Sequence, residues 1–208
     1  VDGKISDKLD ELSKLLFKGT LRHSYPHSWR SKAPLIYRNT PQWFISMEKN
    51  KLRDIALKSI DETTFYPAQG QTRLRSMIET RPDWCISRQR VWGVPLPLFV
   101  SKETGQPLRD ESIIDRIADI YENEGSDTWF TEDPQRFLGD KYSIDDYEQI
   151  KDVVEVWFDS GSTHAFCLEK RDDLKWPASM YLEGSDQHRG WFHSSLLESS
   201  GTRGKAPY

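Results

Sequence analysis

Cysteine, long apolar runs and phosphate-binding loops are scarce or absent in this sequence of 208 residues. Its two cysteines, Cys85 and Cys167, are too few for a disulfide framework or a four-cysteine zinc site, so we expect both to be small, reduced, buried side chains. No run approaches the ~20 apolar residues that a membrane span needs, and no N-terminal stretch resembles a signal peptide. No glycine-rich loop precedes a Walker-type lysine, which argues against a phosphate-loop nucleotide enzyme. We therefore expect a cytoplasmic protein with no membrane contact.

Charge is divided unevenly along the chain, although the net charge is only -4. Residues 1–100 hold 17 Lys and Arg against 10 Asp and Glu, whereas residues 101–160 hold 6 against 17. A basic first half suits contact with a polyanion such as RNA, and an acidic block would repel one. The plainer alternative, that both are solvated surfaces, stays open.

The densest group of polar side chains lies between Tyr181 and Ser195, where acids, an amide, two histidines, an arginine and glycines crowd together. The apolar run 180–182 predicts a short buried strand, and the spacing over 187–197 predicts a helix. The turn between them, 183–186, would then lie at a strand end, where open α/β sheets bind small ligands.

Two readings of that turn follow from its residue types. Gly184 would let a ligand approach the backbone, while Glu183 and Asp186 offer carboxylates to an amine or to ribose hydroxyls. The alternative is a glycine turn with an Asp helix cap and an arginine salt bridge. The residues of the turn alone do not decide between them.

The first hundred residues predict connecting helices and strands. Periodicity and turn residues indicate helices over 6–18, 48–60 and 71–79 and a strand over 35–38. His23 and His27 are four residues apart, but Pro26 between them and the lack of nearby acids or cysteines favour ordinary hydrogen bonding over zinc. In the helix over 48–60 we expect Arg53 on the outer face.

Acidic residues dominate 101–147. An apolar stripe predicts a helix that ends at Gly125, and the carboxylates that follow over 127–147 lack the spacing of a calcium loop. The stripe consists of Ile113, Ile114, Ile117, Ile120 and Tyr121. We expect a small, loop-rich insertion with a structural role.

A second strand end is expected after the β-branched and aromatic run 153–158, which leads into Asp159 and Gly161. It repeats the pattern of the turn at 183–186. The two strand ends would then line one crevice.

At least four separated motifs resemble those of bacterial isoleucyl-tRNA synthetases. Glu-Gly-Ser-Asp-Gln-His-Arg-Gly-Trp-Phe at 183–192 is similar to their adenylate-binding segment, and Val-Trp-Phe-Asp-Ser-Gly-Ser at 156–162 to the segment whose Trp walls the isoleucine pocket. Asp-Trp-Cys-Ile-Ser-Arg-Gln-Arg-x-Trp-Gly at 83–93 is similar to a signature shared with the valine and leucine enzymes. The stretches around 23–30 and 40–44 resemble their connecting ribbons.

This resemblance implies an isoleucyl-adenylate pocket. Trp157 and Trp191 would form its wall, and the other binding residues would be Glu183, Gly184, Asp186 and Gln187. It also implies a mixed α/β fold in which connective strands and helices and an acidic insertion lead into part of a Rossmann-type class I synthetase catalytic domain. The expected boundaries are 1–22 for a helix after the editing domain, 23–100 for the connective region, 101–150 for the insertion and 151–208 for the catalytic part.

The resemblance also limits what the chain does alone. The signature motifs His-Ile-Gly-His and Lys-Met-Ser-Lys-Ser do not occur in it, so we assign it no catalytic residue and no metal site, and expect an internal piece of a longer chain. The parent enzyme would use isoleucine, ATP, Mg²⁺ and tRNA(Ile) as a monomer. The alternative is a tRNA-contacting or purely structural connector module with no activity of its own.

Overall fold

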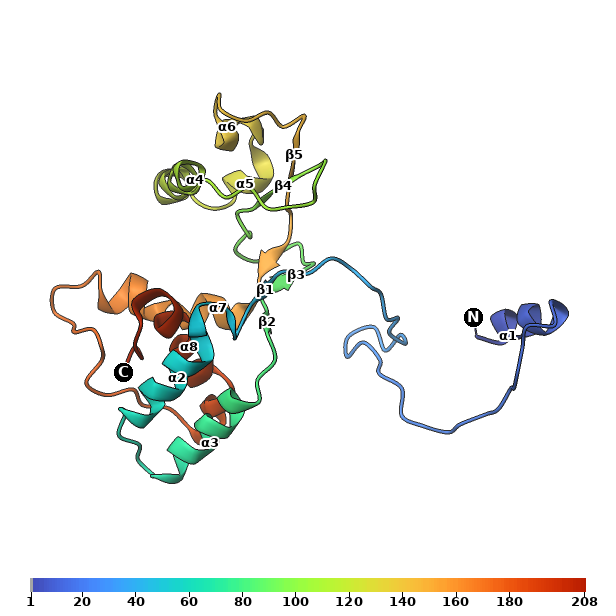
Figure 1. Cartoon of the computed structure of the whole chain (residues 1–208), viewed down its shortest axis with the longest axis horizontal. Coiled ribbons are helices and arrows are strands. Elements are labelled where there is room, and N and C mark those ends of the chain that lie inside the picture. Colours follow the sequence, from blue (N-terminus) through green and yellow to red (C-terminus); the bar gives the residue numbers. More distant parts are fainter. Residues whose placement is uncertain (1) are drawn as a thin grey trace. The chain divides into compact units, whose positions relative to one another are not determined.

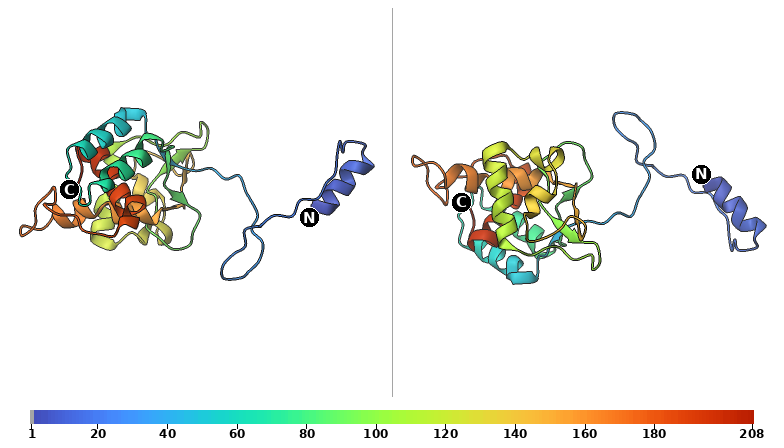
Figure 2. Two further views of the ribbon diagram at one scale, coloured as in Figure 1. Left: turned by 90° about the horizontal axis from the view of Figure 1, so that it is seen from below. Right: turned by 90° about the horizontal axis from the view of Figure 1, so that it is seen from above.

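The computed structural model describes residues 2–208, which divide into two compact units. Unit 1 ends at Pro41, and unit 2 runs from Gln42 to Tyr208 (Figures 1 and 2).

Unit 1 begins with a helix that is shifted from its predicted position. Helix α1 spans Asp2–Glu11 rather than 6–18. It stops there because Ser13 adopts a left-handed conformation (φ 53°) and the Lys14 amide returns to the Leu9 carbonyl at 2.8 Å, which closes the helix end. The predicted apolar stripe does not become a packed face, since Leu12 and Leu16 are exposed.

The remainder of unit 1 has little regular structure. A single bridge between His27 and Pro34 replaces the strand predicted over 35–38, and Ile36 and Tyr37 lie exposed. The prediction was wrong because no strand in the described chain pairs with that segment. His23 and His27 each form a hydrogen bond through Nδ1 to a nearby backbone carbonyl, as expected for ordinary histidines.

Unit 2 contains the other helices and all the strands of the described chain. Its helical elements are η1 (Lys49–Lys51), α2 (Leu52–Asp61), α3 (Gln69–Glu79), α4 (Glu111–Glu124), α5 (Thr128–Thr131), α6 (Gln135–Leu138), α7 (Val156–Gly161), η2 (His164–Leu168), η3 (Ser185–Arg189) and α8 (Trp191–Arg203). Its strands are β1 (Phe44–Ile45), β2 (Trp84–Cys85), β3 (Ser87–Arg88), β4 (Phe99–Ser101), β5 (Tyr147–Gln149) and β6 (Val153–Val154).

The strands form three small antiparallel pairs, β1 with β2, β3 with β6, and β4 with β5. A mixture of helices and small sheets confirms the coarse form of the mixed α/β prediction. Within residues 2–208 no two strands pair in parallel, so the parallel sheet of a Rossmann-type domain is not seen in this part of the chain.

Helix α2 packs against both α3 and α8 (labelled in Figure 1), and the three helices share one hydrophobic core. Leu52, Ala56 and Ile60 of α2 face inward as predicted, and Leu196 and Leu197 of α8 close the core from the other side. Its buried members are Met47, Leu52, Ala56, Ile60, Leu74, Ile78, Trp84, Leu196, Leu197 and Ala206.

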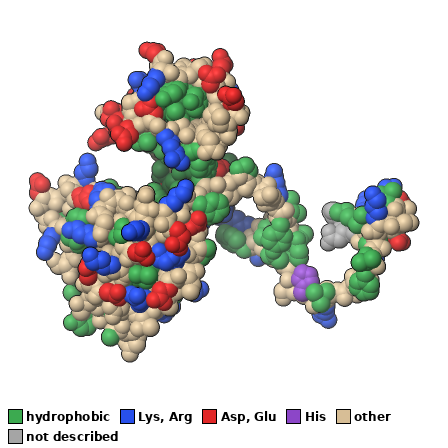
Figure 3. Space-filling view, viewed as in Figure 1, with side chains coloured by type: hydrophobic (Ala, Val, Ile, Leu, Met, Phe, Trp, Pro, Cys, Tyr) green, Lys and Arg blue, Asp and Glu red, His purple; other side chains and the backbone are tan. Residues whose placement is uncertain are grey.

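A second core lies under α4, α5, α6, β4 and β5. Trp129 is fully buried at its centre, contacts Phe99 edge to ring and packs against Phe137 with tilted rings. Helix α4 confirms the predicted end at Gly125, although Ile114 of the predicted stripe faces solvent. The stretch 127–147, predicted to be loop-rich, holds α5, α6 and the start of β5. Acidic side chains gather over this group in Figure 3.

Two predicted strands are wrong. The run 153–158 is a strand only at Val153–Val154 and turns into helix α7, so Trp157 and Asp159 lie on a helix. The run 180–182 has no regular secondary structure, and its Met180 and Leu182 side chains are exposed. The pairing of two strand ends around one crevice is therefore replaced by the packing of α7 against α8 described below.

Candidate functional site

The signature segment 83–93 is held between strands on both sides. β2 pairs Trp84 with Ile45, and β3 pairs Ser87 with Val154, which leads directly into α7. The Ser87 hydroxyl also accepts a hydrogen bond from the Trp43 amide at 2.8 Å. Three motifs that are distant in sequence are thereby brought together by backbone pairing.

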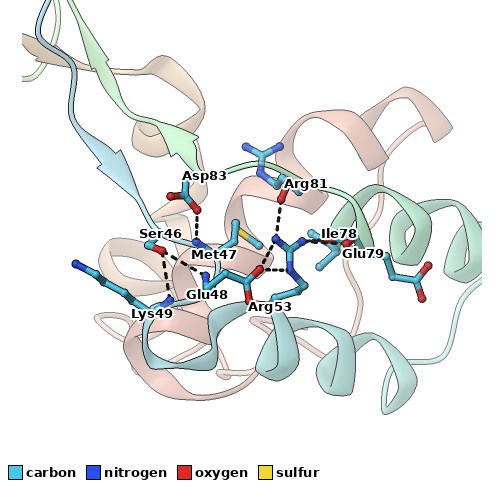
Figure 4. A network of polar contacts seen from close by, with 9 residues as sticks. All are labelled: Ser46, Met47, Glu48, Lys49, Arg53, Ile78, Glu79, Arg81 and Asp83. Atoms are coloured by element: carbon cyan, nitrogen blue, oxygen red, sulfur yellow. Dashed lines mark hydrogen bonds and ion pairs between the residues drawn. The ribbon is translucent and has the colours of Figure 1, made fainter.

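Arg53 fixes the approach to this segment (Figure 4). Its guanidinium donates to the Ile78, Glu79 and Arg81 carbonyls at 2.5, 3.1 and 2.8 Å and so satisfies the carboxyl end of α3. The predicted outward position of Arg53 is wrong, because its side chain is only 19% exposed. This cap sets the path of the backbone that carries Arg81 and Asp83.

Helix α7 packs closely on α8 at two glycines, Gly161 of α7 and Gly190 at the N-cap of α8. A Cβ added to Gly190 would lie 2.9 Å from the Trp157 ring, and one added to Gly161 would lie 2.1 Å from Glu198 Oε1. In addition, Trp191 Nε1 donates to the Ser160 carbonyl at 2.9 Å. The absence of a side chain at each glycine allows the two helices to approach to this distance.

A cavity of about 340 Å³ opens where these elements meet. The signature segment forms one wall, and α7, Gly190 and α8 form the other. It is lined by Arg81, Pro82, Asp83, Trp84, Cys85, Arg88, Glu155, Trp157, Arg189, Gly190, His193 and Ser194. Aromatic rings and charged groups of both signs thus face the same space.

Several buried polar atoms of the residues that line the cavity have no hydrogen-bond partner within the described chain. Among the described residues, neither His193 Nε2 nor Glu155 Oε2 has a hydrogen-bond partner, and the same is true of Arg81 Nε. Burial lowers the pKa of the Arg81 guanidinium, while the charge of Glu155 opposes that shift. Arg88 lies 3.9 Å from the same Glu155 carboxylate.

His193 and Glu198 on α8 are both neutral at pH 7. Burial, followed by the charges of Arg81 and Arg189, lowers the pKa of His193 to about 3. Burial, followed by the charges of Asp159 and Glu155, raises the pKa of the Glu198 carboxyl to about 9.

The predicted site residues are only partly brought together. Trp157 lines the cavity. The Gln187 side chain accepts from the Trp191 amide at 2.9 Å and donates to Asp186 at 3.1 Å, which links these three residues in a chain. Trp191 also stacks on Tyr181 at 3.9 Å.

Glu183 and Gly184 stand apart from the cavity. Both are exposed, and Gly184 has ordinary extended dihedrals (φ -67°, ψ 160°), so its conformation does not require glycine. A Cβ there would meet only the Asp186 carboxylate. Of the six predicted site residues, Trp157 is therefore the one that lines the cavity.

Sequence reasoning missed Arg81, Glu155 and His193, which line the cavity, and Glu198, whose carboxyl lies beside it against Gly161. The serines around Leu196 and Leu197 gave no sign that residues 193–200 of α8 are buried, because serine is more often exposed than buried.

Elsewhere, a hollow of about 750 Å³ lies beside β4 and α6, at a distance in the fold from Trp157. Its basic residues are already engaged, since Lys141 pairs with Asp110 and Lys102 donates to the Ile144 carbonyl.

Across residues 2–208, no three His, Cys, Asp or Glu side chains are grouped so as to hold a metal ion. None of the described helices is long and apolar enough to cross a membrane.

Comparison with known proteins gives consistent matches. The family model for tRNA synthetases class I (I, L, M and V) matches residues 7–208. The chain is 70% identical over 204 residues to the isoleucine-tRNA ligase of Pelagibacter ubique (strain HTCC1062), a match covering 98% of this chain and 22% of that protein. It is 60% identical over 210 residues to the isoleucine-tRNA ligase of Brucella abortus biovar 1 (strain 9-941), covering 98% and 21%, and 55% identical over 216 residues to that of Zymomonas mobilis, covering 100% and 23%. The chain spans about a fifth of the length of these relatives.

Proposed function

Because this chain belongs to the class I tRNA synthetase family of the I, L, M and V enzymes, we propose that it is part of an isoleucine-tRNA ligase. The observation that carries the proposal is the match over residues 7–208 together with relatives that are named for isoleucine. The parent enzyme would join isoleucine to ATP, release pyrophosphate, and pass the isoleucyl group from the adenylate to a tRNA(Ile) ribose hydroxyl.

In that reaction the chain supplies binding rather than acid or base catalysis. Glu183, Gly184, Asp186 and Gln187 would hold the isoleucyl-adenylate through its amine and ribose, and no catalytic side chain is assigned to the chain. Positioning of reactants accounts for much of the acceleration in such transfers, so a binding surface contributes directly to the rate. The hydrogen-bonded chain from Asp186 through Gln187 to Trp191 supports this assignment, since it ties the polar residues to an aromatic wall.

Trp157 and Trp191 would wall the isoleucine side chain. Their elements are in contact, because the Trp157 ring lies against Gly190 and Trp191 donates to Ser160. Such a wall excludes larger side chains, but valine differs from isoleucine by one methylene, which is worth only ~1 to 3 kcal/mol. We therefore expect the parent enzyme to need an editing site for valine outside these residues.

The proposed domain plan follows the family. Residues 1–22 would follow the editing domain, 23–100 would connect, 101–150 would form the acidic insertion, and 151–208 would belong to a Rossmann-type catalytic domain. The second core under α4 to α6 supports a separate insertion, since it shares no residue with the first. The parent would act in the cytoplasm as a monomer.

The family also implies ATP with Mg²⁺. Magnesium prefers carboxylate and water oxygens, but the described residues offer no group of three metal-ligating side chains. We therefore assign no metal ligand and no metal-dependent step to this chain.

The assignment of Glu183 is tested in the longer protein that contains this chain. Glu183→Ala should weaken isoleucyl-adenylate binding and slow adenylate formation, measured by pyrophosphate exchange, because a carboxylate partner of the ligand is lost. Glu148→Ala removes an equally exposed carboxylate on β5 and should leave the rate unchanged. Equal rates for the Glu183 variant and the unaltered protein would refute the assignment.

A second measurement uses the 208 residues alone. We expect no isoleucine-dependent pyrophosphate exchange, because neither ATP signature motif lies in the sequence. We also expect no hydrolysis of mischarged tRNA, because the Asp-bearing motif of the editing pocket does not lie in it either. Clear turnover would contradict the division of roles proposed here.

A further inference from the structure

The Glu198 carboxyl occupies an unusual position between two helices. The residue is 7% exposed, and within the described chain its Oε1 atom has no hydrogen-bond partner. It faces the bare Cα of Gly161, where an added Cβ would lie 2.1 Å from Oε1 and 3.0 Å from the Ser194 carbonyl carbon. A buried carboxyl without a partner is costly, so its presence at this contact calls for a reason.

The contact lies at one end of the helix that carries Trp157. Gly161 ends α7, and Trp157 precedes it by about one turn, with its ring against Gly190. Between them, Ser160 accepts the hydrogen bond from Trp191. Three contacts therefore position helix α7: the Glu198 carboxyl against Gly161, the Trp191 indole N–H on the Ser160 carbonyl, and the Trp157 ring against Gly190.

The charges around Glu198 determine when this packing is favourable. Asp159 and Glu155 on the α7 side act on Glu198, and Glu198 in turn acts on the Tyr181 phenol. The pKa of Glu198 is raised to about 9, so at pH 7 the carboxyl is neutral and packs against α7 without repulsion. Loss of its proton would place a third negative charge beside the two acids and push α7 away from α8.

We propose that Glu198 is a positioning residue for Trp157: its buried carboxyl, seated against Gly161, sets how closely α7 packs on α8 and so where the Trp157 ring lies. The effect on isoleucine selection rests on the proposed function, in which Trp157 walls the amino-acid pocket. The effect of Glu198 on the position of the Trp157 ring is independent of the proposed function.

The ring position is measured in the 208-residue protein labelled with 5-fluorotryptophan. Trp157→Phe identifies the Trp157 ¹⁹F resonance, which should shift between pH 7 and pH 10 with a midpoint near the pKa of about 9. Glu198→Gln keeps the shape of the side chain and cannot ionise, so the pH 7 resonance should stay in place and the alkaline shift should disappear. Glu148→Gln, at the exposed middle position of β5, should retain the shift.

A steric variant provides an independent check. Gly161→Ala should displace the Trp157 resonance at pH 7, because its Cβ cannot coexist with the present position of the carboxyl. If this variant does not fold, the Glu198→Gln comparison still decides. An alkaline shift that persists in Glu198→Gln, or a folded Gly161→Ala protein with an unmoved resonance, would overturn the proposal.

The consequence for selection is measured in the longer protein. There Gly161→Ala should raise KM for isoleucine by roughly tenfold with a smaller change in kcat, comparable to a one-methylene mismatch in an apolar pocket. If the resonance moves as expected and KM does not, Glu198 positions Trp157 but Trp157 does not wall the isoleucine pocket. That outcome refutes the role of Trp157 in the proposed function and leaves the positioning intact.

Discussion

Replacing His193 by asparagine should change how the stability of the protein depends on pH. His193 is 6% exposed on α8, and burial together with Arg81 and Arg189 lowers its pKa to about 3. In the unfolded chain the same imidazole would titrate near its ordinary value of about 6.5. Asparagine has no titratable group, but its amide can replace the ring nitrogen that reaches the His188 carbonyl.

Proton linkage gives the sign and the size of the change in the free energy of unfolding with pH. Between pH 6.5 and pH 3 the unfolded state binds a proton at His193 and the folded state does not, so stability falls as the pH falls. Each pH unit corresponds to about 1.4 kcal/mol, so His193 removes about 2 kcal/mol of the free energy of unfolding between pH 6.5 and pH 5. The contribution vanishes about one pH unit above 6.5, near pH 7.5, because the imidazole is then neutral in both states.

Urea unfolding measured from pH 7.5 to pH 5 tests this. The difference in free energy of unfolding between His193→Asn and the unaltered protein should shift by about 2 kcal/mol in favour of the variant on going to pH 5. His23→Asn, which changes an exposed histidine of unit 1, should give no such shift. Parallel pH profiles for His193→Asn and the unaltered protein would show that His193 titrates normally and that the reasoning is wrong.

Two further predictions concern packing. Trp129→Ala should lower the free energy of unfolding by about 3–5 kcal/mol in urea titrations, because a fully buried ring and its hydrogen bond to the Ile150 carbonyl are lost. Trp92→Ala, at an exposed position, should leave the free energy of unfolding nearly unchanged. Arg53→Lys keeps the charge, but its single ammonium nitrogen cannot occupy the positions of both Nη1, which donates to Ile78 and Glu79, and Nη2, which donates to Arg81. We expect a loss of about 1–3 kcal/mol and faster amide exchange at the end of α3, and unchanged exchange there would contradict the capping role.

Neighbouring residues in the sequence were sufficient to predict a helix whose first and last turns are capped by its own flanking residues. Helix α4 was predictable because Asp110 caps its first turn, accepting from the Ser112 amide at 3.0 Å, and Gly125 ends it with a positive φ. Both residues act within one turn of the helix. The periodicity of Ile113 and Ile117 then placed its buried face.

Helix α7 could not be predicted in the same way. Its residues favour a strand by propensity, and the helix is stabilised by contacts of Trp157 with Gly190, of Phe158 with Trp84, and of Gly161 with α8. Each partner lies at least 30 residues away in the sequence or on another element. The same separation explains the site: the motifs were recognisable, but the cavity that joins Arg81, Trp157 and His193 depends on strand pairing that no single segment encodes.

The pairing of β4 with β5 also bears on how this stretch of chain can change in length. Phe99 lies opposite Gln149, and the Ile150 amide donates to the Leu98 carbonyl at 2.9 Å. The two ends of the segment between β4 and β5 are therefore hydrogen-bonded neighbours. Everything between these residues is a closed excursion whose ends are already together. A change in the length of its exposed loops would alter a loop-closure entropy that varies slowly with length, whereas exchanging the whole segment would also remove the second core, in which Trp129 packs on Phe99 of β4. The β1–β2 and β3–β6 pairs beside the cavity lie outside this segment.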